Sequence, residues 1–334
     1  MKKEQIEILI NECRILPSTN YPEPIYRMGI SDGKNIIQFG GEGDLSVVTG
    51  KAKSTKTFLM GIMAASALTH TTNGENDPNS TNKIIYFDTE QSHYNASKSL
   101  YRITAIARKN NNDDIQYYAL RGLNVNERIK FIEHVLIITP EVKAVFIDGA
   151  RDLVSSINDE HQATLVIDLF AKWTRMGAFH LVTVLHENSS TEKLRGHLGT
   201  ELTNKAENVF VVELERNSTC TTSNVYTRYS RNGNYLEFSF FIGDDGIPKI
   251  NLNSKKQLDY NEPEVISCLK EVFNDNPQIG HTQFMNKFQG ILKDNGIEKG
   301  RNVLKKWLIN YLELGVLCKE GNDRSPRAYY YLKS

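Results

Sequence analysis

Apolar runs alternate with longer helical patterns from residue 44 onward. The runs predicted as strands span residues 45–49, 83–88, 115–120, 143–148, 178–186 and 208–214. The stretches predicted as helices lie near 56–70, 93–109, 125–138 and 159–176. Several strand runs, such as IIYF and VKAVFI, are almost continuously apolar, which is typical of strands covered on both faces. The alternation therefore predicts an α/β fold with a mainly parallel sheet.

The pattern changes twice in the last third of the chain. The runs NVYTRYSR and YLEFSFFI flank a turn at 232–234 and predict an antiparallel hairpin. A polar linker follows, and then three helical patterns and two short strands in the order of a winged-helix domain. The predicted domains are an N-terminal helix and lead-in segment at 1–39, the α/β domain at 40–248, the linker at 249–261 and the winged-helix domain at 262–334.

Composition and charge exclude several classes of protein. The 334 residues are 40% hydrophobic, with 40 Lys+Arg against 40 Asp+Glu, which excludes disordered and fibrous chains. No apolar run is long enough to span a membrane, and MKKEQIEILINECRIL predicts an amphipathic helix rather than a signal peptide. The four cysteines are far apart, so we expect a cytoplasmic protein without zinc or disulfides. The zero net charge divides into −3 over residues 1–254 and +3 over 255–334, which directs attention to the C-terminal end.

The segment GDLSVVTGKAKSTKTFLMG matches a phosphate-binding loop between a strand and a helix. Gly50, Lys56 and Thr57 occupy the fixed places of G-x-x-x-x-G-K-[ST], while Thr55 replaces the second glycine. If that position requires a positive φ, threonine costs up to about 1–2 kcal/mol there. The predicted nucleotide-binding residues are Gly50, Lys51, Ala52, Lys53, Ser54, Thr55, Lys56 and Thr57.

Asp148 ends the apolar run KAVFIDG, as the carboxylate of a Walker B strand does. We therefore expect ATP and Mg²⁺ as cofactors, with Thr57 and Asp148 holding the metal. The next residue is Gly149 rather than Glu, which disfavours enzymes that place a catalytic glutamate directly after Walker B.

The strand IIYFDTEQS ends at Glu90, and here the chain resembles the RecA/DnaB superfamily of hexameric, DNA-linked ATPases. Over residues 40–245 it is most similar to the RepA-like helicases and ATPases of bacterial plasmids and mobilisable elements, through GKAKSTKT, DTEQ and IDGARDL. The resemblance implies a RecA-like fold, assembly into a ring, expected to be a hexamer, and a role in DNA replication or mobilisation.

The resemblance also implies roles for individual residues. Glu90 would orient the attacking water, with Lys56 beside it as a catalytic cation. His186, at the end of LVTVLH, would sense the γ-phosphate, although a lone histidine is more often structural. Lys193 and Arg195, in the following loop KLRGHLGTEL, would touch DNA or the nucleotide of a neighbouring subunit.

Two arginines in YTRYSRNGN, Arg228 and Arg231, are candidates for a finger that acts across a subunit interface. Such a residue stabilises the charge of the transferring phosphoryl group. Each residue can instead be an exposed arginine of the predicted hairpin. The sequence does not show which of the two arginines would act as the finger.

The C-terminal domain offers a basic set for contact with DNA phosphates. A winged helix can place its third helix in the major groove while the wing meets the backbone, although many winged helices bind protein instead. The predicted DNA-binding residues are Lys299, Arg301, Lys305, Lys306, Arg324 and Arg327. We expect single-stranded DNA in the ring and duplex DNA at the winged helix.

Three functions follow from these observations. The first is an ATP-dependent, helicase-like DNA motor that hydrolyses ATP at subunit interfaces. The alternative is a nucleotide-gated DNA-binding initiator or regulator with little turnover, suggested by Thr55 and the compact C-terminal domain. A small-molecule kinase is disfavoured, since no segment reads as a lid or an acceptor pocket.

Overall fold

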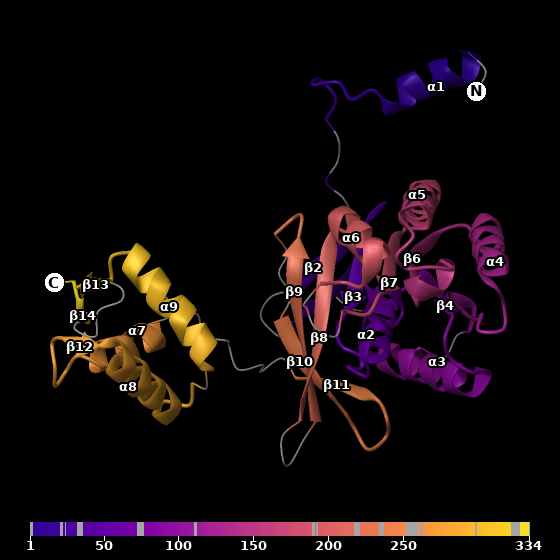
Figure 1. Ribbon diagram of the computed structural model, residues 1–334. Helices are drawn as coiled ribbons and strands as arrows, with labels where there is room; N and C mark the ends of the chain where they lie inside the picture. The colour runs from indigo at the N-terminus through magenta and orange to yellow at the C-terminus, as the bar shows by residue number, and fades with distance from the viewer. Residues whose placement is uncertain are drawn as a thin grey trace. The chain divides into compact units, whose positions relative to one another are not determined.

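The computed structural model divides the chain into two compact units, Met1–Asn253 and Ser254–Ser334, each treated by itself below (Figure 1). The structure describes residues 3–20, 23, 25–31, 36–71, 77–109, 112–188, 191, 193–216, 221–233, 237–251, 260, 263–297, 299–321 and 328–333.

The first unit is built on a nine-stranded sheet, counted over the described residues, with the order β11-β10-β9-β8-β3-β7-β6-β4-β5. Its strands are β3 (Leu45–Thr49), β4 (Lys83–Asp88), β5 (Ile115–Ala119), β6 (Val142–Asp148), β7 (His180–Val184), β8 (Asn208–Arg216), β9 (Thr221–Ser230), β10 (Glu237–Ile242) and β11 (Pro248–Asn251). Strands β8 through β5 in this order pair in parallel, and β9, β10 and β11 extend the sheet antiparallel. The first unit is therefore an α/β unit with a large, mainly parallel sheet, as the alternating pattern of the sequence predicts.

Two hydrophobic cores lie on the opposite faces of the sheet. One core packs α2 (Lys56–Thr69) and α3 (His93–Ala107) on one face. The other packs α4 (Val125–Ile138), α5 (Glu160–Gly177) and α6 (Gly196–Lys205) on the other face. Neighbouring residues along β6 enter different cores, because successive side chains of a strand point to opposite faces. The apolar pattern of these strands is therefore explained by cover on both sides.

The helices begin at side-chain caps that the sequence supplies. Asn124 and Glu127 form a capping box at the start of α4, and Asp159 accepts a hydrogen bond from the backbone of Gln162 at the start of α5. Helix α2 differs, since its apolar sequence FLMGIMAASAL is buried over most of its surface. It is thus the central helix of its layer, directly behind the phosphate loop.

The segment before residue 40 contains more structure than a lead-in. Helix α1 (Lys3–Cys13) is followed by the antiparallel hairpin of β1 (Tyr26–Ser31) and β2 (Ile36–Gly41). The hairpin packs against α2, where the Ser66 hydroxyl donates to the carbonyl of Gly29 at 2.8 Å and accepts from its N–H at 3.0 Å. At the other end of the unit, β11 carries the sheet to Asn251, inside the segment expected as linker.

The second unit contains α7 (Pro263–Glu271), α8 (His281–Asp294) and α9 (Arg301–Glu313). Its antiparallel sheet has the order β12-β14-β13, formed by β12 (Ile279–Gly280), β13 (Leu317–Glu320) and β14 (Tyr329–Leu332). Leu304, Trp307, Leu308 and Tyr311 of α9 are buried in the core of this unit, as their helical spacing predicts.

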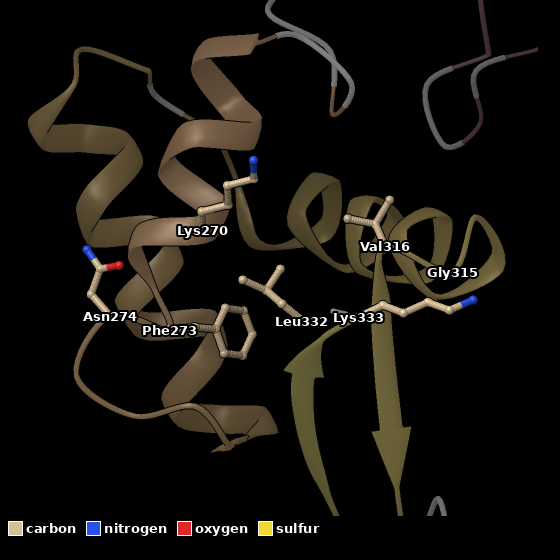
Figure 2. Close-up of a pocket in the computed structure, with 7 residues that line it drawn as sticks. All are labelled: Lys270, Phe273, Asn274, Gly315, Val316, Leu332 and Lys333. Carbon is tan, nitrogen blue, oxygen red and sulfur yellow. The ribbon is translucent and has the colours of Figure 1, made fainter.

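An open hollow of about 440 Å³ lies in the second unit (Figure 2). Its lining combines apolar side chains with lysines and an amide, namely Lys270, Phe273, Asn274, Gly315, Val316, Leu332 and Lys333. None of the predicted site residues lines it. Across the described part of the chain, no helix is both long and apolar enough to cross a membrane.

Candidate nucleotide-binding site

The loop between β3 and α2 has the shape of a phosphate cradle. Gly50 adopts a φ of 150°, and a Cβ atom there would meet the carbonyl oxygen of Val212 at 2.4 Å. Lys56 is buried and turns back into the loop, where its Nζ donates to the carbonyls of Gly50 at 3.2 Å and Lys51 at 2.7 Å. Burial lowers the pKa of Lys56, while the carboxylates of Asp148, Glu90 and Glu187 act to raise it. The Lys56 ammonium group therefore interacts with the charges of three carboxylates.

Thr55, the residue in place of the second glycine, is left-handed with a φ of 62°. A β-branched residue is uncommon in this conformation, which costs about 1–2 kcal/mol. Its Oγ1 donates to the carbonyl of Ser54 at 2.5 Å and lies 2.7 Å from the hydroxyl of Ser223 on β9. The position thus does require a positive φ, and the threonine hydroxyl makes contacts that glycine lacks.

Thr57, in the first turn of α2, lies close to Asp148 at the end of β6, and its hydroxyl acts on the pKa of that carboxyl. Tyr86 donates a hydrogen bond to Asp148 at 3.0 Å. Burial and, after it, the nearby charge of Asp88 raise the pKa of Asp148 to about 7, while the hydroxyls of Tyr86 and Thr57 act to lower it. The predicted metal pair is therefore together in the structure.

Gly149 has a structural reason to follow Asp148. Its φ is 120°, and a Cβ atom would lie 2.2 Å from the Thr89 hydroxyl. Thr89 in turn donates to the Asp148 carbonyl at 2.9 Å and lies 2.8 Å from Oδ2 of Asp152. A glutamate at this position would collide with the end of β4, so the carboxylate that faces the site must come from elsewhere.

Glu90 supplies that carboxylate from the turn after β4. The turn is fixed by Asp88, whose Oδ1 accepts from the backbone N–H groups of Glu90 at 3.1 Å and Gln91 at 2.9 Å. Desolvation raises the pKa of Glu90, the charges of Asp152 and Asp88 raise it further, and Lys56 lowers it. Asp88 therefore supports the strand end, while Glu90 is exposed and close enough to Lys56 for the two charges to interact.

His186 follows β7 and lies close to Lys56. Burial lowers its pKa, and the charges of Lys56 and Arg195 lower it further. Within the described residues its Nδ1 is buried without a hydrogen-bond partner. An unsatisfied buried polar atom beside the phosphate loop is consistent with a group that pairs only when ligand is present.

The loop after His186 returns to it. The Arg195 N–H donates to the His186 carbonyl at 3.0 Å, and Glu187 forms an isolated antiparallel bridge with Leu194. Lys193 and Arg195 have exposed side chains, and α6 begins directly after Arg195. The loop is therefore anchored at His186 and carries two exposed cations.

The two arginines left undecided by the sequence occupy different places. Arg228 lies 2.7 Å from Oε1 of Glu187, and both side chains are largely buried. Arg231 donates to the carbonyls of Asn204 and Lys205, each at 3.2 Å, at the C-terminal end of α6. Arg228 is thus beside the phosphate loop of its own chain, whereas Arg231 hydrogen bonds to the last carbonyls of α6.

Glu187 is the main acid that the sequence reasoning missed. Its N–H donates to the Gly50 carbonyl at 3.3 Å, so it joins the loop after β7 to the phosphate loop. Its only signal in the sequence is its place directly after His186. Tyr86, Tyr117 and Ser223 were missed as well, and no local motif marks them.

The predicted DNA-binding set is described only in part. Arg301 and Lys305 are exposed one turn apart on α9, and Lys299 lies over the ring of Trp307 at 5.3 Å. Lys306 also lies on α9, but its side chain is outside the described residues, as are Arg324 and Arg327. Arg301 and Lys305 thus lie in the N-terminal part of α9, and Lys299 lies just before the helix begins.

The residues at the loop fit Mg²⁺ and a nucleotide. Mg²⁺ is usually held by one or two protein oxygens together with substrate phosphates rather than by a cage of side chains. The described residues accordingly contain no group of three or more His, Cys, Asp or Glu placed to hold a metal ion. The Thr57 hydroxyl and the Asp148 carboxylate are the oxygens that would hold it, beside a loop too narrow for a side chain at Gly50.

Comparisons with known proteins do not assign a family. No protein-family model and no curated protein matches the chain. Solved structures that align with it include a KaiC-like protein from Pyrococcus horikoshii OT3, with 14% identity and a TM-score of 0.45 over 63% of this chain and 90% of that chain. Another is the flagellar accessory protein FlaH from Methanocaldococcus jannaschii, with 13% identity and a TM-score of 0.42 over the same shares of the two chains. Both TM-scores lie below 0.5, so no step of the functional assignment depends on these likenesses.

Proposed function

We propose that the first unit binds ATP with Mg²⁺ and hydrolyses it. The observation that carries the proposal is the closeness of the Thr57 hydroxyl, at the end of the phosphate loop, to the buried Asp148 carboxylate at the end of β6. A hydroxyl and a carboxylate at these two places are the protein oxygens that Mg²⁺ requires in a P-loop enzyme. The buried Lys56 beside them supports the same reading.

Each residue of the site has a role in this proposal. The loop N–H groups from Gly50 to Thr57 bind the phosphates, and Lys56 leaves the loop carbonyls to pair with the β- and γ-phosphates. Bound Mg²⁺ neutralises charge on the phosphate oxygens. Glu90 orients and deprotonates the attacking water, for which its raised pKa is suited. His186 donates an N–H to a γ-phosphate oxygen through Nδ1, which has no partner among the described residues.

We further propose that the chain is a DNA-associated, helicase-like motor of a replication or mobilisation system, assembled as a ring of six. The support is the set of exposed cations, Lys193 and Arg195 on the loop after His186, and Arg301 and Lys305 on α9. The loop cations would reach single-stranded DNA or a neighbour's nucleotide. The second unit, in the element order of a winged helix, would contact duplex phosphates through α9 and the wing.

ATP turnover with and without single-stranded DNA tests this function. A motor hydrolyses ATP slowly alone and several-fold faster with DNA, and the stimulation falls in a Lys193→Ala, Arg195→Ala double variant. The double variant Arg301→Ala, Lys305→Ala should bind duplex DNA more weakly than the wild type does. If DNA leaves turnover unchanged over a range of salt concentrations, the motor is excluded.

The second candidate function is a nucleotide-gated DNA-binding regulator with little turnover. Thr55 is the observation that favours it, because its left-handed backbone stores strain in the phosphate loop. Such a protein changes its oligomeric size on binding ATP and hydrolyses little. Sedimentation with ATP and with ADP, measured beside the turnover assay, separates the two functions.

A further inference from the structure

The side chain of Thr55 is directed away from the helix that it precedes. Thr55 is the N-cap residue of α2, but its hydroxyl makes no capping hydrogen bond to the first turn. Its Oγ1 lies 2.7 Å from Oγ of Ser223, a residue of β9 far along the chain. The hydroxyl therefore connects the phosphate loop to the antiparallel part of the sheet.

The direction of this hydrogen bond follows from counting protons. Thr55 Oγ1 is 2.5 Å from the Ser54 carbonyl, which can only accept. A hydroxyl has one proton and two lone pairs, so Thr55 donates to Ser54 and accepts from Ser223. Ser223 is only 2% exposed, so its hydroxyl is shielded from solvent. The Ser223 hydroxyl therefore donates its one proton to Oγ1 of Thr55.

Ser223 is fixed by strands on both sides. It pairs with Leu214 of β8 and with Phe240 of β10. At the other end of the loop, Gly50 lies against the carbonyl of Val212, also on β8. The phosphate loop is therefore held at its start by close packing on β8 and at its end by a hydroxyl from β9.

We propose that Ser223 is a positioning residue for the phosphate loop. Its hydroxyl holds Thr55 in the left-handed conformation that glycine adopts without help, and so presets the loop N–H groups for a triphosphate. The inference rests on the proposed nucleotide binding, and Ser223 itself touches no substrate. It has a specific consequence, which is that the Ser223 hydroxyl matters only while residue 55 is threonine.

Kinetics and binding of the full-length chain test this. For Ser223→Ala we expect the KM for ATP and the Kd for ADP to rise about fivefold to tenfold, with kcat within about twofold. Thr227→Val is the matched control, since it removes a buried hydroxyl from the same face of β9 where the strand pairs with Phe210 in the body of the sheet. It should leave KM unchanged even if it lowers stability.

Thr55→Gly completes the cycle. Glycine needs no support at position 55, so adding Ser223→Ala to Thr55→Gly should leave the Kd for ADP of that variant unchanged, whatever its value. An unchanged Kd in Ser223→Ala, or the same loss with Gly at position 55, would overturn the proposal.

Thr55→Val gives an independent test in case Ser223→Ala does not fold. Valine keeps the branched shape without the hydroxyl, so the same rise in Kd is expected, and wild-type affinity would contradict the proposal. The nucleotide site itself is judged separately. If Lys56→Ala binds ATP as wild type does, the proposed function fails whatever Ser223 does.

Discussion

The hydroxyl of Tyr86 on β4 donates a 3.0 Å hydrogen bond to Oδ2 of Asp148 at the end of β6. The Tyr86 ring stacks on Tyr117 with centroids 4.6 Å apart, and the Tyr117 hydroxyl donates to Oδ2 of Asp88 at 2.8 Å. Asp88 and Asp148 are themselves paired across the two strands. Two stacked tyrosines therefore hold the two carboxylates at the edge of the sheet where the phosphate loop lies.

Removing the Tyr86 hydroxyl should weaken the metal site without disturbing the stack. In Tyr86→Phe, Asp148 loses a partner that orients it, so we expect the Mg²⁺ concentration for half-maximal turnover to rise by about tenfold. Tyr118→Phe is the control, because its hydroxyl donates to Gln116 instead. An unchanged Mg²⁺ midpoint in Tyr86→Phe would show that Asp148 needs no support from β4.

Glu90→Gln should separate binding from hydrolysis. The amide keeps the size of the side chain but cannot accept a proton from water, so kcat should fall by about 10²–10⁴-fold while ATP still binds. Glu160→Gln, at an exposed position in the first turn of α5, serves as the control. Wild-type turnover in Glu90→Gln would remove this residue from the mechanism.

Mixing experiments should show which cations act across an interface. Arg228 is paired with Glu187 of its own chain, so Arg228→Ala should lose activity that Glu90→Gln subunits do not restore. Lys193→Ala with Arg195→Ala removes exposed loop cations, and here the Glu90→Gln subunits should restore turnover. Recovery with Arg228→Ala would instead identify Arg228 as a finger acting in trans.

Arg231→Ala is expected to affect stability alone. Its guanidinium satisfies two carbonyls at the end of α6, so the free energy of unfolding should fall by about 1 kcal/mol at unchanged turnover. Denaturant unfolding beside the ATPase assay makes this comparison. A large loss of turnover in Arg231→Ala would mean that the two arginines have been assigned the wrong way round.

His180 should make the fold sensitive to acid. Burial lowers its pKa to about 4 from 6.5, with Nδ1 2.8 Å from the Gly41 carbonyl and Nε2 2.9 Å from the Ser46 hydroxyl. Between these pH values the unfolded chain binds the proton and the folded chain does not, so stability is full above pH 6.5 and falls as pH drops toward 4. Over this pH range the free energy of unfolding falls by about 3 kcal/mol.

Unfolding of His180→Gln at several pH values checks this prediction. The slope of the unfolding free energy against pH should decrease by about one proton over that window. His70, whose pKa burial also lowers to about 4, keeps part of the slope in the variant. An identical slope in wild type and His180→Gln would contradict the assignment.

The sequence predicted the parallel strands well and missed elements with few apolar residues. Strands β3 and β4 begin and end at the predicted residues, because their side chains are buried in both cores. The sequence pattern predicts a loop where the structure has α6, because GHLGTELTNK buries only Leu198, Gly199 and Leu202 and so shows little helical periodicity. The hairpin of β1 and β2 is short and rich in glycine, so its periodicity is weak.

The motif residues of the site were accessible to sequence reasoning, and their partners were not. Lys56 and Thr57 follow β3 through the phosphate loop, and Asp148 ends β6. The carboxyl ends of these parallel strands share one edge of the sheet, so order along the chain is enough to place the three residues together. Ser223 reaches Thr55 only through the register of β9 against β8. Such contacts depend on pairing between distant segments, which no local pattern encodes.

The central claim is that the loop from Gly50 to Thr57 binds ATP through Lys56. Equilibrium titration of the chain with ATP and Mg²⁺ tests it directly, comparing wild type with Lys56→Ala and with Lys130→Ala, an exposed lysine of α4. We predict saturable binding in wild type and Lys130→Ala and a loss of affinity of at least about tenfold in Lys56→Ala. Equal affinity in all three proteins, or no binding by wild type, would contradict the account.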